Sequence, residues 1–276
     1  MPASQLIRID DPDDPRIAGY RDIRERDLVG RQGRFVAEGT VVLRLLVDAH
    51  ARGTRFTAES ILLLENRVAG LEEIVASVPA GIPVFVTSAA VMNAVAGFDI
   101  HRGVLALGRR TTMATIGNIV DRLPAHALVV AACGISNHDN IGAIFRNAAA
   151  FGADAVLMDE TCCDPLYRKA LRVSVGSVLR IPYARQGGIP HMVSALAAGG
   201  FDIWGLSPSG TVDIRGLDPG MRLALLTGTE GEGLPTPILQ SIRTARIPQA
   251  PGLDSLNAGT ATGIALFAMA SAMKRI

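Results

Sequence analysis

The chain has 276 residues, of which 49% are hydrophobic and 19% are charged, and this composition indicates a well-packed soluble protein with little disorder. The formal net charge of +1 does not by itself indicate a nucleic-acid partner. No apolar run reaches the length of a membrane-spanning helix, so we expect no membrane association.

The N-terminal hundred residues alternate between short apolar runs and segments with helical spacing. Strands are predicted at 34–37, 61–64, 84–86 and 104–107, and helices at 39–51, 71–78 and 89–95. This order predicts a small α/β domain over residues 1–108. Residues 109–118 contain Thr and Gly and have no clear period, so residues 109–125 are predicted to be a linker and the start of the second domain, which covers 126–276.

The second domain repeats the alternation on a larger scale. Strands are predicted at 128–132, 155–158, 178–181, 201–206, 223–226 and 244–247, and helices at 141–150, 165–175, 189–198, 235–241 and 256–273. Because the strand segments are continuously apolar, they predict a parallel sheet covered on both faces.

Three cysteines, Cys133, Cys162 and Cys163, indicate the redox environment. Their odd number and the adjacent pair argue against a disulfide framework and favour the reducing cytoplasm. The pair has no further Cys or nearby His, so we expect no metal site.

The predicted helix at 141–150 has one apolar face, and a single arginine, Arg146, lies off that face. Asn137 and Asp139 are candidate N-terminal caps, and Phe151-Gly152 predicts the end. Arg146 lies off the apolar face, at the end of a predicted strand where anionic ligands bind in open α/β sheets. An ordinary surface arginine is the equally weighted alternative. The apolar face consists of Ile141, Ile144, Phe145 and Ala148.

A local basic patch follows. Between Pro165 and Arg185 there are five basic residues and no acidic one, and such a patch is able to contact a phosphate backbone. A solvated protein surface explains the charges equally well. The five residues are Arg168, Lys169, Arg172, Arg180 and Arg185.

A glycine-rich segment, LALLTGTEGEGL over residues 223–234, predicts a buried strand that runs into a ligand-binding loop. Gly228, Gly231 and Gly233 allow positive φ angles and close backbone approach. The loop lacks the residues of a P-loop, and its acids Glu230 and Glu232 would repel phosphate. A neutral or cationic ligand fits better, and S-adenosylmethionine carries a sulfonium charge.

The last marked segment, RIPQAPGLDSLNAGTATG over residues 246–263, predicts a strand, an irregular turn and a helix of small residues. Asp254 or Ser255 is a candidate cap for this helix. Its small face suits tight packing against another helix.

Together these segments resemble the SpoU (TrmH-like) RNA 2′-O-ribose methyltransferases of the SPOUT superfamily. The family motif N-x-G-x-x-x-R-N-A-x-x-F-G-A matches residues 140–153, G-x-E-G-x-G-[LM] matches 228–234, and I-P-x-x-x-x-x-x-S-L-N matches 247–257. Residues 172–182 look like its R-x-S-x-G…P element. Two departures are Gln249 in place of the usual Met, and Ala-Gly-Thr in place of Val-Ser-Val after Asn257.

The resemblance implies a fold and an activity. The expected fold is α/β, with a C-terminal parallel-sheet SPOUT domain that contains a trefoil knot. A smaller ribosomal-protein-L30e-like α/β domain that binds the RNA substrate is expected to precede it, with an F-x-x-E-G turn at residues 35–39. The implied reaction is S-adenosylmethionine-dependent methylation of a ribose 2′-OH in structured RNA, rRNA in preference to tRNA, by a homodimer. The alternatives are a non-catalytic RNA-binding protein of the same fold and a SPOUT enzyme that methylates a base.

The resemblance also assigns residues to roles. Thr227, Gly228, Ile247 and Leu256 take the cofactor-binding positions, and Arg168, Lys169 and Arg172 are expected to bind RNA. The catalytic positions are Arg146, Asn140, Ser255, Asn257 and Glu230. An arginine is effectively always protonated, so we favour a role for Arg146 in orienting phosphate, or in phosphate-assisted deprotonation, over that of a base.

Overall fold

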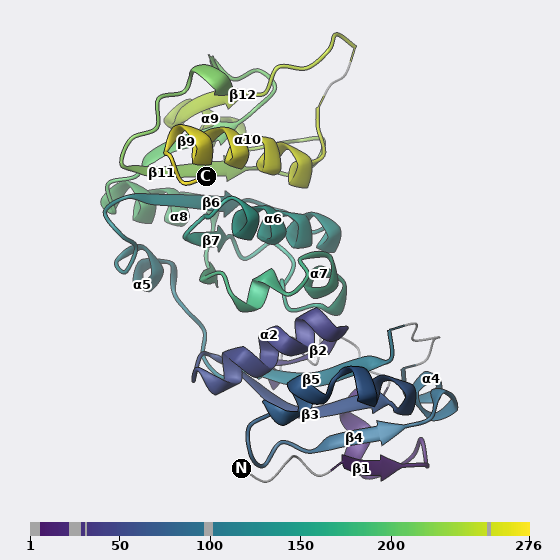
Figure 1. Ribbon diagram of the computed structural model, residues 1–276. Coiled ribbons are helices and arrows are strands. Elements are labelled where there is room, and N and C mark those ends of the chain that lie inside the picture. The colour runs from purple at the N-terminus through teal and green to yellow at the C-terminus, as the bar shows by residue number, and fades with distance from the viewer. Residues whose placement is uncertain (1–5, 22–28, 31, 97–101, 253–254) are drawn as a thin grey trace. The chain divides into compact units, whose positions relative to one another are not determined.

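The computed structural model describes residues 6–21, 29–30, 32–96, 102–252 and 255–276 (Figure 1). The chain divides into two compact units. One consists of residues 1–113 and 166–179, and the other of residues 114–165 and 180–276. No helix within the described ranges is long and apolar enough to cross a membrane.

The unit of residues 114–165 and 180–276 contains a seven-stranded sheet in the order β10-β12-β9-β11-β6-β7-β8. Every neighbouring pair in this sheet is parallel, as the continuous apolar runs predicted. The strands are β6 (Ala127–Ala132), β7 (Ala155–Met158), β8 (Tyr183–Arg185), β9 (Asp202–Leu206), β10 (Val212–Asp213), β11 (Arg222–Thr227) and β12 (Arg243–Arg246).

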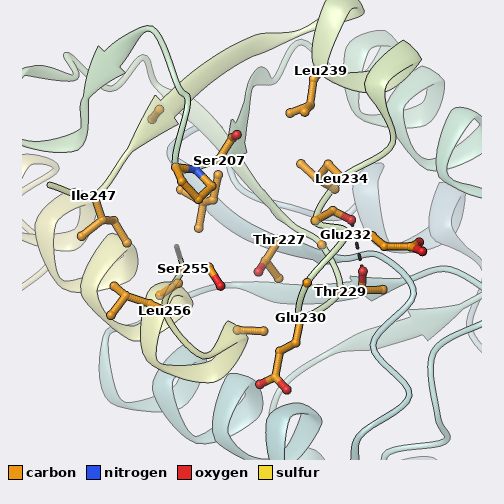
Figure 2. Close-up of a pocket in the computed structure, with 18 of the residues that line it drawn as sticks. Ser207, Thr227, Thr229, Glu230, Glu232, Leu234, Leu239, Ile247, Ser255 and Leu256 are labelled. Carbon is orange, nitrogen blue, oxygen red and sulfur yellow. Dashed lines mark hydrogen bonds between the residues drawn. The ribbon is translucent and has the colours of Figure 1, made fainter. Parts of the chain in front are cut away.

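Helices cover both faces of this sheet. Residues of α5, α8 and α9 share one apolar core with β6 and β11, whereas α10 packs against α6 and β11. Because all strands are parallel, the loops that follow β9, β11 and β12 meet at one edge of the sheet (Figure 2). The helices are α5 (Ile116–Val120), α6 (His138–Ala150), α8 (Ile189–Ala198), α9 (Thr236–Ser241) and α10 (Ala258–Ala272).

Helix α6 forms as its sequence predicts. Asn137 is the N-cap, and its side chain accepts a hydrogen bond from the backbone N–H of Asp139; the helix ends at Phe151, before Gly152 with φ +67°. The predicted apolar face of Ile141, Ile144, Phe145 and Ala148 is fully buried. The strand before it and the helix together bring the first motif to the carboxyl edge of the sheet.

Several elements differ from the prediction. The apolar run 178–181 is not a strand; it contains a buried 3-10 turn (Ser177–Leu179), and strand β8 begins only after Pro182, which has no N–H to donate to a ladder. The predicted linker contains helix α5. Helix α10 is capped by Asn257 and not by Ser255, while Asp254 lies outside the described residues.

The other unit contains a five-stranded mixed sheet in the order β1-β4-β3-β5-β2. β3 pairs with β4 in parallel and with β5 antiparallel, and β1, which was not predicted, adds to β4. The strands are β1 (Leu6–Ile9), β2 (Arg34–Glu38), β3 (Phe56–Leu64), β4 (Val84–Thr87) and β5 (Val104–Arg110). The helices are α2 (Thr40–Ala51), α3 (Glu72–Ala76), α4 (Ala89–Ala96) and α7 (Arg168–Val173), with 3-10 turns η1 (Pro15–Tyr20) and η2 (Glu65–Gly70).

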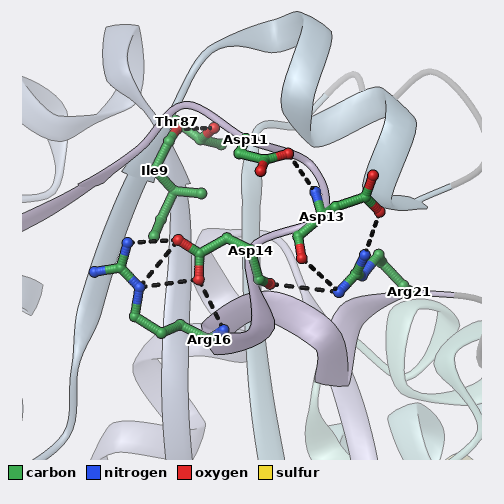
Figure 3. Close-up of polar contacts among 7 residues, drawn as sticks. All are labelled: Ile9, Asp11, Asp13, Asp14, Arg16, Arg21 and Thr87. Carbon is green, nitrogen blue, oxygen red and sulfur yellow. Dashed lines mark hydrogen bonds and ion pairs between the residues drawn. The ribbon is translucent and has the colours of Figure 1, made fainter.

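The connection between β1 and η1 is held by side chains (Figure 3). The buried Thr87 hydroxyl donates to the Ile9 carbonyl at 2.8 Å and ties the end of β1 to β4. Asp14 caps η1 and pairs with Arg16, and this hydrogen-bonded guanidinium lowers the pKa of Asp14 to about 2. Arg21 pairs with Asp13. The acidic start of the unit is therefore locally neutralised.

The packing of α10 on α6 depends on the absence of side-chain atoms at two glycines. A Cβ at position 259 would lie 2.7 Å from the Ala143 Cβ, and one at 263 would lie 2.7 Å from the Asn147 Nδ2. Asn147 Nδ2 also donates to the Gly259 carbonyl at 2.9 Å. The small helix face predicted from the sequence is thus a close helix–helix contact.

We expect Gly259→Ala to lower the free energy of unfolding by about 1–3 kcal/mol, because the new methyl group overlaps a short side chain that cannot turn away. The matched control is Gly117→Ala, at an exposed helical position with open space around it. This control should raise the free energy of unfolding by up to about 1 kcal/mol through helix propensity. Chemical denaturation measures both, and equal effects would contradict the packing argument.

Candidate functional site

A pocket of about 400 Å³ lies where the loops after β9, β11 and β12 meet the start of α10 (Figure 2). This is the carboxyl edge of a parallel sheet, where open α/β folds bind their ligands. The walls combine aliphatic side chains with loop backbone and a few polar groups. The lining residues are Leu206, Ser207, Pro208, residues 227–234, Leu239, Ala245, Ile247, Gln249, Ser255, Leu256, Ala258 and Ala261.

The glycine-rich loop after β11 is a tight reversal of the chain. Thr229 and Gly233 exchange two backbone hydrogen bonds, of 3.3 and 3.1 Å, and Gly231 and Gly233 have φ values of +90° and +71°. A Cβ at Gly228 would overlap the backbone of Gly233 and Leu234. The close approach predicted for this glycine is therefore an approach to the loop's own backbone, and it fixes the shape of the pocket wall.

The pocket brings together residues that the sequence placed in separate motifs. All four positions expected to bind the cofactor, Thr227, Gly228, Ile247 and Leu256, line it, and so do Ser255 and Glu230.

Sequence reasoning missed the contribution of β9. Leu206, Ser207 and Pro208 form one side of the pocket, yet they belong to no recognised motif. The signal that could have found them is positional, because the carboxyl end of a strand next to β11 must lie at the same edge of the sheet. Leu239 of α9 was missed in the same way.

Three polar residues from the three motifs bond to one another. Asn140 on α6 donates from Nδ2 to Glu230 Oε1 at 2.8 Å, and Asn257 donates from Nδ2 to the same oxygen and to Asn140 Oδ1, the latter at 2.8 Å. Asn257 Oδ1 accepts from the backbone N–H of Thr260 at 3.1 Å and caps α10. We call these three residues the polar triangle. It joins α6, the glycine loop and the start of α10.

The polar triangle explains the direction of the Glu230 side chain, which points toward α6 (Figure 2). Asn140 is only 4% exposed, so its carboxamide needs internal partners, and it has one for its donor and one for its acceptor.

Arg146 lies on α6 outside the pocket lining. It is exposed, whereas its neighbours Phe145 and Asn147 face the sheet and α10 respectively. Within the described ranges, its guanidinium forms no ion pair. The side chain is thus available to an anionic group from outside the chain.

The basic residues of α7 face an acid of their own unit. Arg168 and Arg172 lie 3.6 and 3.9 Å from the Glu38 carboxylate, whose side chain is only 7% exposed. Part of the positive charge of these two arginines is therefore neutralised by Glu38. Arg185, of the same predicted patch, donates to the carbonyls of Glu160 and Cys162.

The three cysteines are free and offer no nucleophile at neutral pH. Burial raises the pKa of Cys162 and of Cys163 to about 12, and it raises the pKa of Cys133 as well. In the part of the chain that the structure describes, no group of three or more His, Cys, Asp or Glu side chains is arranged to hold a metal ion.

Comparison with known proteins agrees with the motifs. Residues 127–267 match the model of the SpoU rRNA Methylase family. An uncharacterised tRNA/rRNA methyltransferase of Mycobacterium bovis is 38% identical over 267 residues, which cover 93% of this chain and 89% of the relative.

Two solved structures are similar over almost the whole chain. The AdoMet-bound rRNA methyltransferase from Sinorhizobium meliloti is 26% identical with a TM-score of 0.80, and 99% of each chain is covered. An RNA 2′-O ribose methyltransferase is 25% identical with a TM-score of 0.77 over 98% of this chain and 100% of that one. The chain therefore belongs to the SpoU rRNA Methylase family, as its three motifs predicted.

We expect Asn257→Ala to lower the free energy of unfolding by about 2 kcal/mol, because it removes both a helix cap and one of the two amide donors of the polar triangle. Asn257→Ser keeps an acceptor that is able to cap α10 but lacks the amide donor, so its cost should be smaller. Denaturant titration of both variants separates the two contributions. Equal losses in the two variants would show that the cap contributes nothing.

Proposed function

We propose that this protein transfers a methyl group from S-adenosylmethionine to a ribose 2′-oxygen of structured RNA, rRNA in preference to tRNA. The observation that carries the proposal is the pocket formed by the second and third motifs and linked by the polar triangle to the helix that bears Arg146. The family and the relatives support it, since one similar structure is AdoMet-bound and another is a 2′-O ribose methyltransferase.

The pocket suits this cofactor physically. Its volume of about 400 Å³ lies within the usual range for small-molecule sites. The aliphatic side chains of Leu206, Ile247 and Leu256 suit the apolar faces of the adenine ring. Backbone groups of the glycine loop line the same pocket and are able to form hydrogen bonds with the polar edge of the ring. The carboxylates of Glu230 and Glu232 favour a cationic ligand over a phosphate-bearing one.

S-adenosylmethionine supplies an electrophilic methyl group on a sulfonium centre. The contribution of the protein is placement, because holding two reacting groups close and aligned removes most of the entropic barrier. The polar triangle fixes the glycine loop relative to α6. The position of the pocket relative to the helix that bears Arg146 is therefore fixed as well.

In this proposal Arg146 binds a phosphate of the RNA next to the target ribose. A guanidinium remains protonated under all ordinary conditions, so it orients the phosphate and lowers the charge around the hydroxyl without accepting its proton. The proton leaves to the phosphate oxygen or to solvent. Asn140, Glu230 and Asn257 act by positioning the loop, and Ser255, at the pocket wall, faces the ligand.

The RNA is proposed to bind through the N-terminal domain and the basic residues Arg168, Lys169 and Arg172. The mixed sheet with α2 and α4 supports the ribosomal-protein-L30e-like assignment of this domain, which would read RNA by shape and by unpaired bases. The contacts of Arg168 and Arg172 with Glu38 leave a smaller net positive charge there than the sequence implies.

A homodimer, a trefoil knot in the C-terminal domain and a cytoplasmic location belong to the same proposal. On the α10 surface, Phe267 is 56% exposed and Ile264 is 39% exposed, and both line a shallow groove between α6 and α10, which supports an interface with a second copy. Light scattering of the purified protein measures its oligomeric state, and an active monomer would refute the proposed homodimer. Helix α10, which follows β12 in the chain, packs against α6, and this return supports the knot.

Incubation of the purified protein with labelled S-adenosylmethionine and RNA from a strain lacking the gene tests the activity. We expect incorporation into rRNA, and nucleoside analysis should show a 2′-O-methyl product. A methylated base would favour the alternative SPOUT chemistry. RNA binding without incorporation, by folded protein, would favour a non-catalytic binding protein.

We expect Arg146→Lys to lower turnover by about a hundredfold, because a point charge cannot reproduce the two parallel hydrogen bonds of the guanidinium. The affinity for S-adenosylhomocysteine should stay within about twofold of that of the unmodified protein, since Arg146 does not line the pocket.

The matched control is Arg122→Lys, an exposed arginine in the segment that leads into the amino end of β6, at the opposite edge of the sheet from the pocket. Its turnover should not change. Full activity of Arg146→Lys would exclude any requirement for the guanidinium fork.

A further inference from the structure

The pocket contains a polar group with no internal partner. Gln249 is half-buried and lines the pocket, and its Oε1 is covered from solvent without a hydrogen-bond partner in the described part of the chain. A buried carboxamide oxygen left unsatisfied destabilises a protein by roughly 1–3 kcal/mol, so such a group calls for an explanation.

Three other polar side chains of the pocket lining have partners within the chain. Glu230 belongs to the polar triangle, Ser207 bonds to Ser209 at 3.0 Å, and the Thr229 hydroxyl reaches the Gly233 carbonyl at 3.4 Å. Among the described lining residues, Gln249 is the one with a side-chain oxygen that is covered from solvent and has no hydrogen-bond partner, so this acceptor is left for an occupant.

The surroundings of Gln249 define what that occupant offers. Aliphatic side chains share the pocket with it and suit the faces of a flat ring; they are Leu206, Leu234, Leu239, Ala245, Ile247 and Leu256. A carboxamide places one acceptor beside one donor. The same alternation, reversed, occurs at the edge of adenine, where the exocyclic amine lies beside a ring nitrogen, and glutamine pairs with this edge in two parallel hydrogen bonds.

We propose that Gln249 reads the adenine of the methyl donor, with its Oε1 accepting from the exocyclic amine and its Nε2 donating to the neighbouring ring nitrogen. The inference rests on the proposed function, because it names the group that the pocket recognises. It also gives a physical meaning to the departure from the usual Met at this position, since a thioether has no donor and is only a weak acceptor.

Calorimetric titration with two ligands tests the proposal. The first is S-adenosylhomocysteine, and the second is its analogue that carries hydrogen in place of the exocyclic amine. We expect Gln249→Met, which keeps the length of the side chain and removes the amide, to weaken S-adenosylhomocysteine binding by about tenfold and binding of the analogue by less than about twofold. The preference for the amine should therefore shrink by at least about fivefold.

The matched control is Gln240→Met, the same substitution at an exposed position of α9 outside the pocket, and it should keep the unmodified preference. The ratio of the two affinities within one variant does not depend on the fraction of folded protein, so partial unfolding cannot imitate the effect.

An unchanged ratio in Gln249→Met, or equal weakening of both ligands, would overturn the assignment of Gln249 while leaving the proposed function standing. Failure of the unmodified, folded protein to bind S-adenosylhomocysteine at all would instead remove the proposed function.

Discussion

The Glu230 carboxylate accepts hydrogen bonds from two asparagines that lie 90 residues before it and 27 residues after it in the chain. On its own, a loop with glycines at 228, 231 and 233 would have many accessible conformations. The two amides hold this loop against α6 and against the start of α10, and the third contact, between the asparagines themselves, closes the ring. The shape of the pocket depends on these contacts, because residues of the glycine loop and residues at the start of α10 both line the cavity.

The polar triangle also changes how the family motifs are interpreted. Asn140, Glu230 and Asn257 are polar residues in three separate motifs, and each could have faced a ligand. In the structure they face one another, so their chemical requirement is mutual: two amide donors and one shared acceptor. Ser255 and Gln249 are different, since both line the pocket and neither belongs to the polar triangle.

Much of this arrangement follows from the sequence. The continuous apolar runs predicted that the strands of the large sheet are parallel. The spacing of Ile141, Ile144, Phe145 and Ala148 predicted the buried face of α6. What the sequence could not give were features that depend on contacts between distant segments. Strand β8 was misplaced because a buried 3-10 turn has the same apolar composition as a strand. Asn257 was not recognised as the cap of α10, and the side of the pocket formed by β9 has no motif to reveal it.

The contact between Ala143 and Gly259 has an evolutionary consequence. Position 259 already carries the smallest residue, so no substitution there can make room for a larger neighbour on α6. Drift at position 143 should accordingly be confined to glycine, alanine or serine throughout the lineage of this protein. A bulkier residue at 143 would require the axes of α6 and α10 to move apart. The hydrogen bonds of the polar triangle, which join the starts of these helices, would then have to change as well.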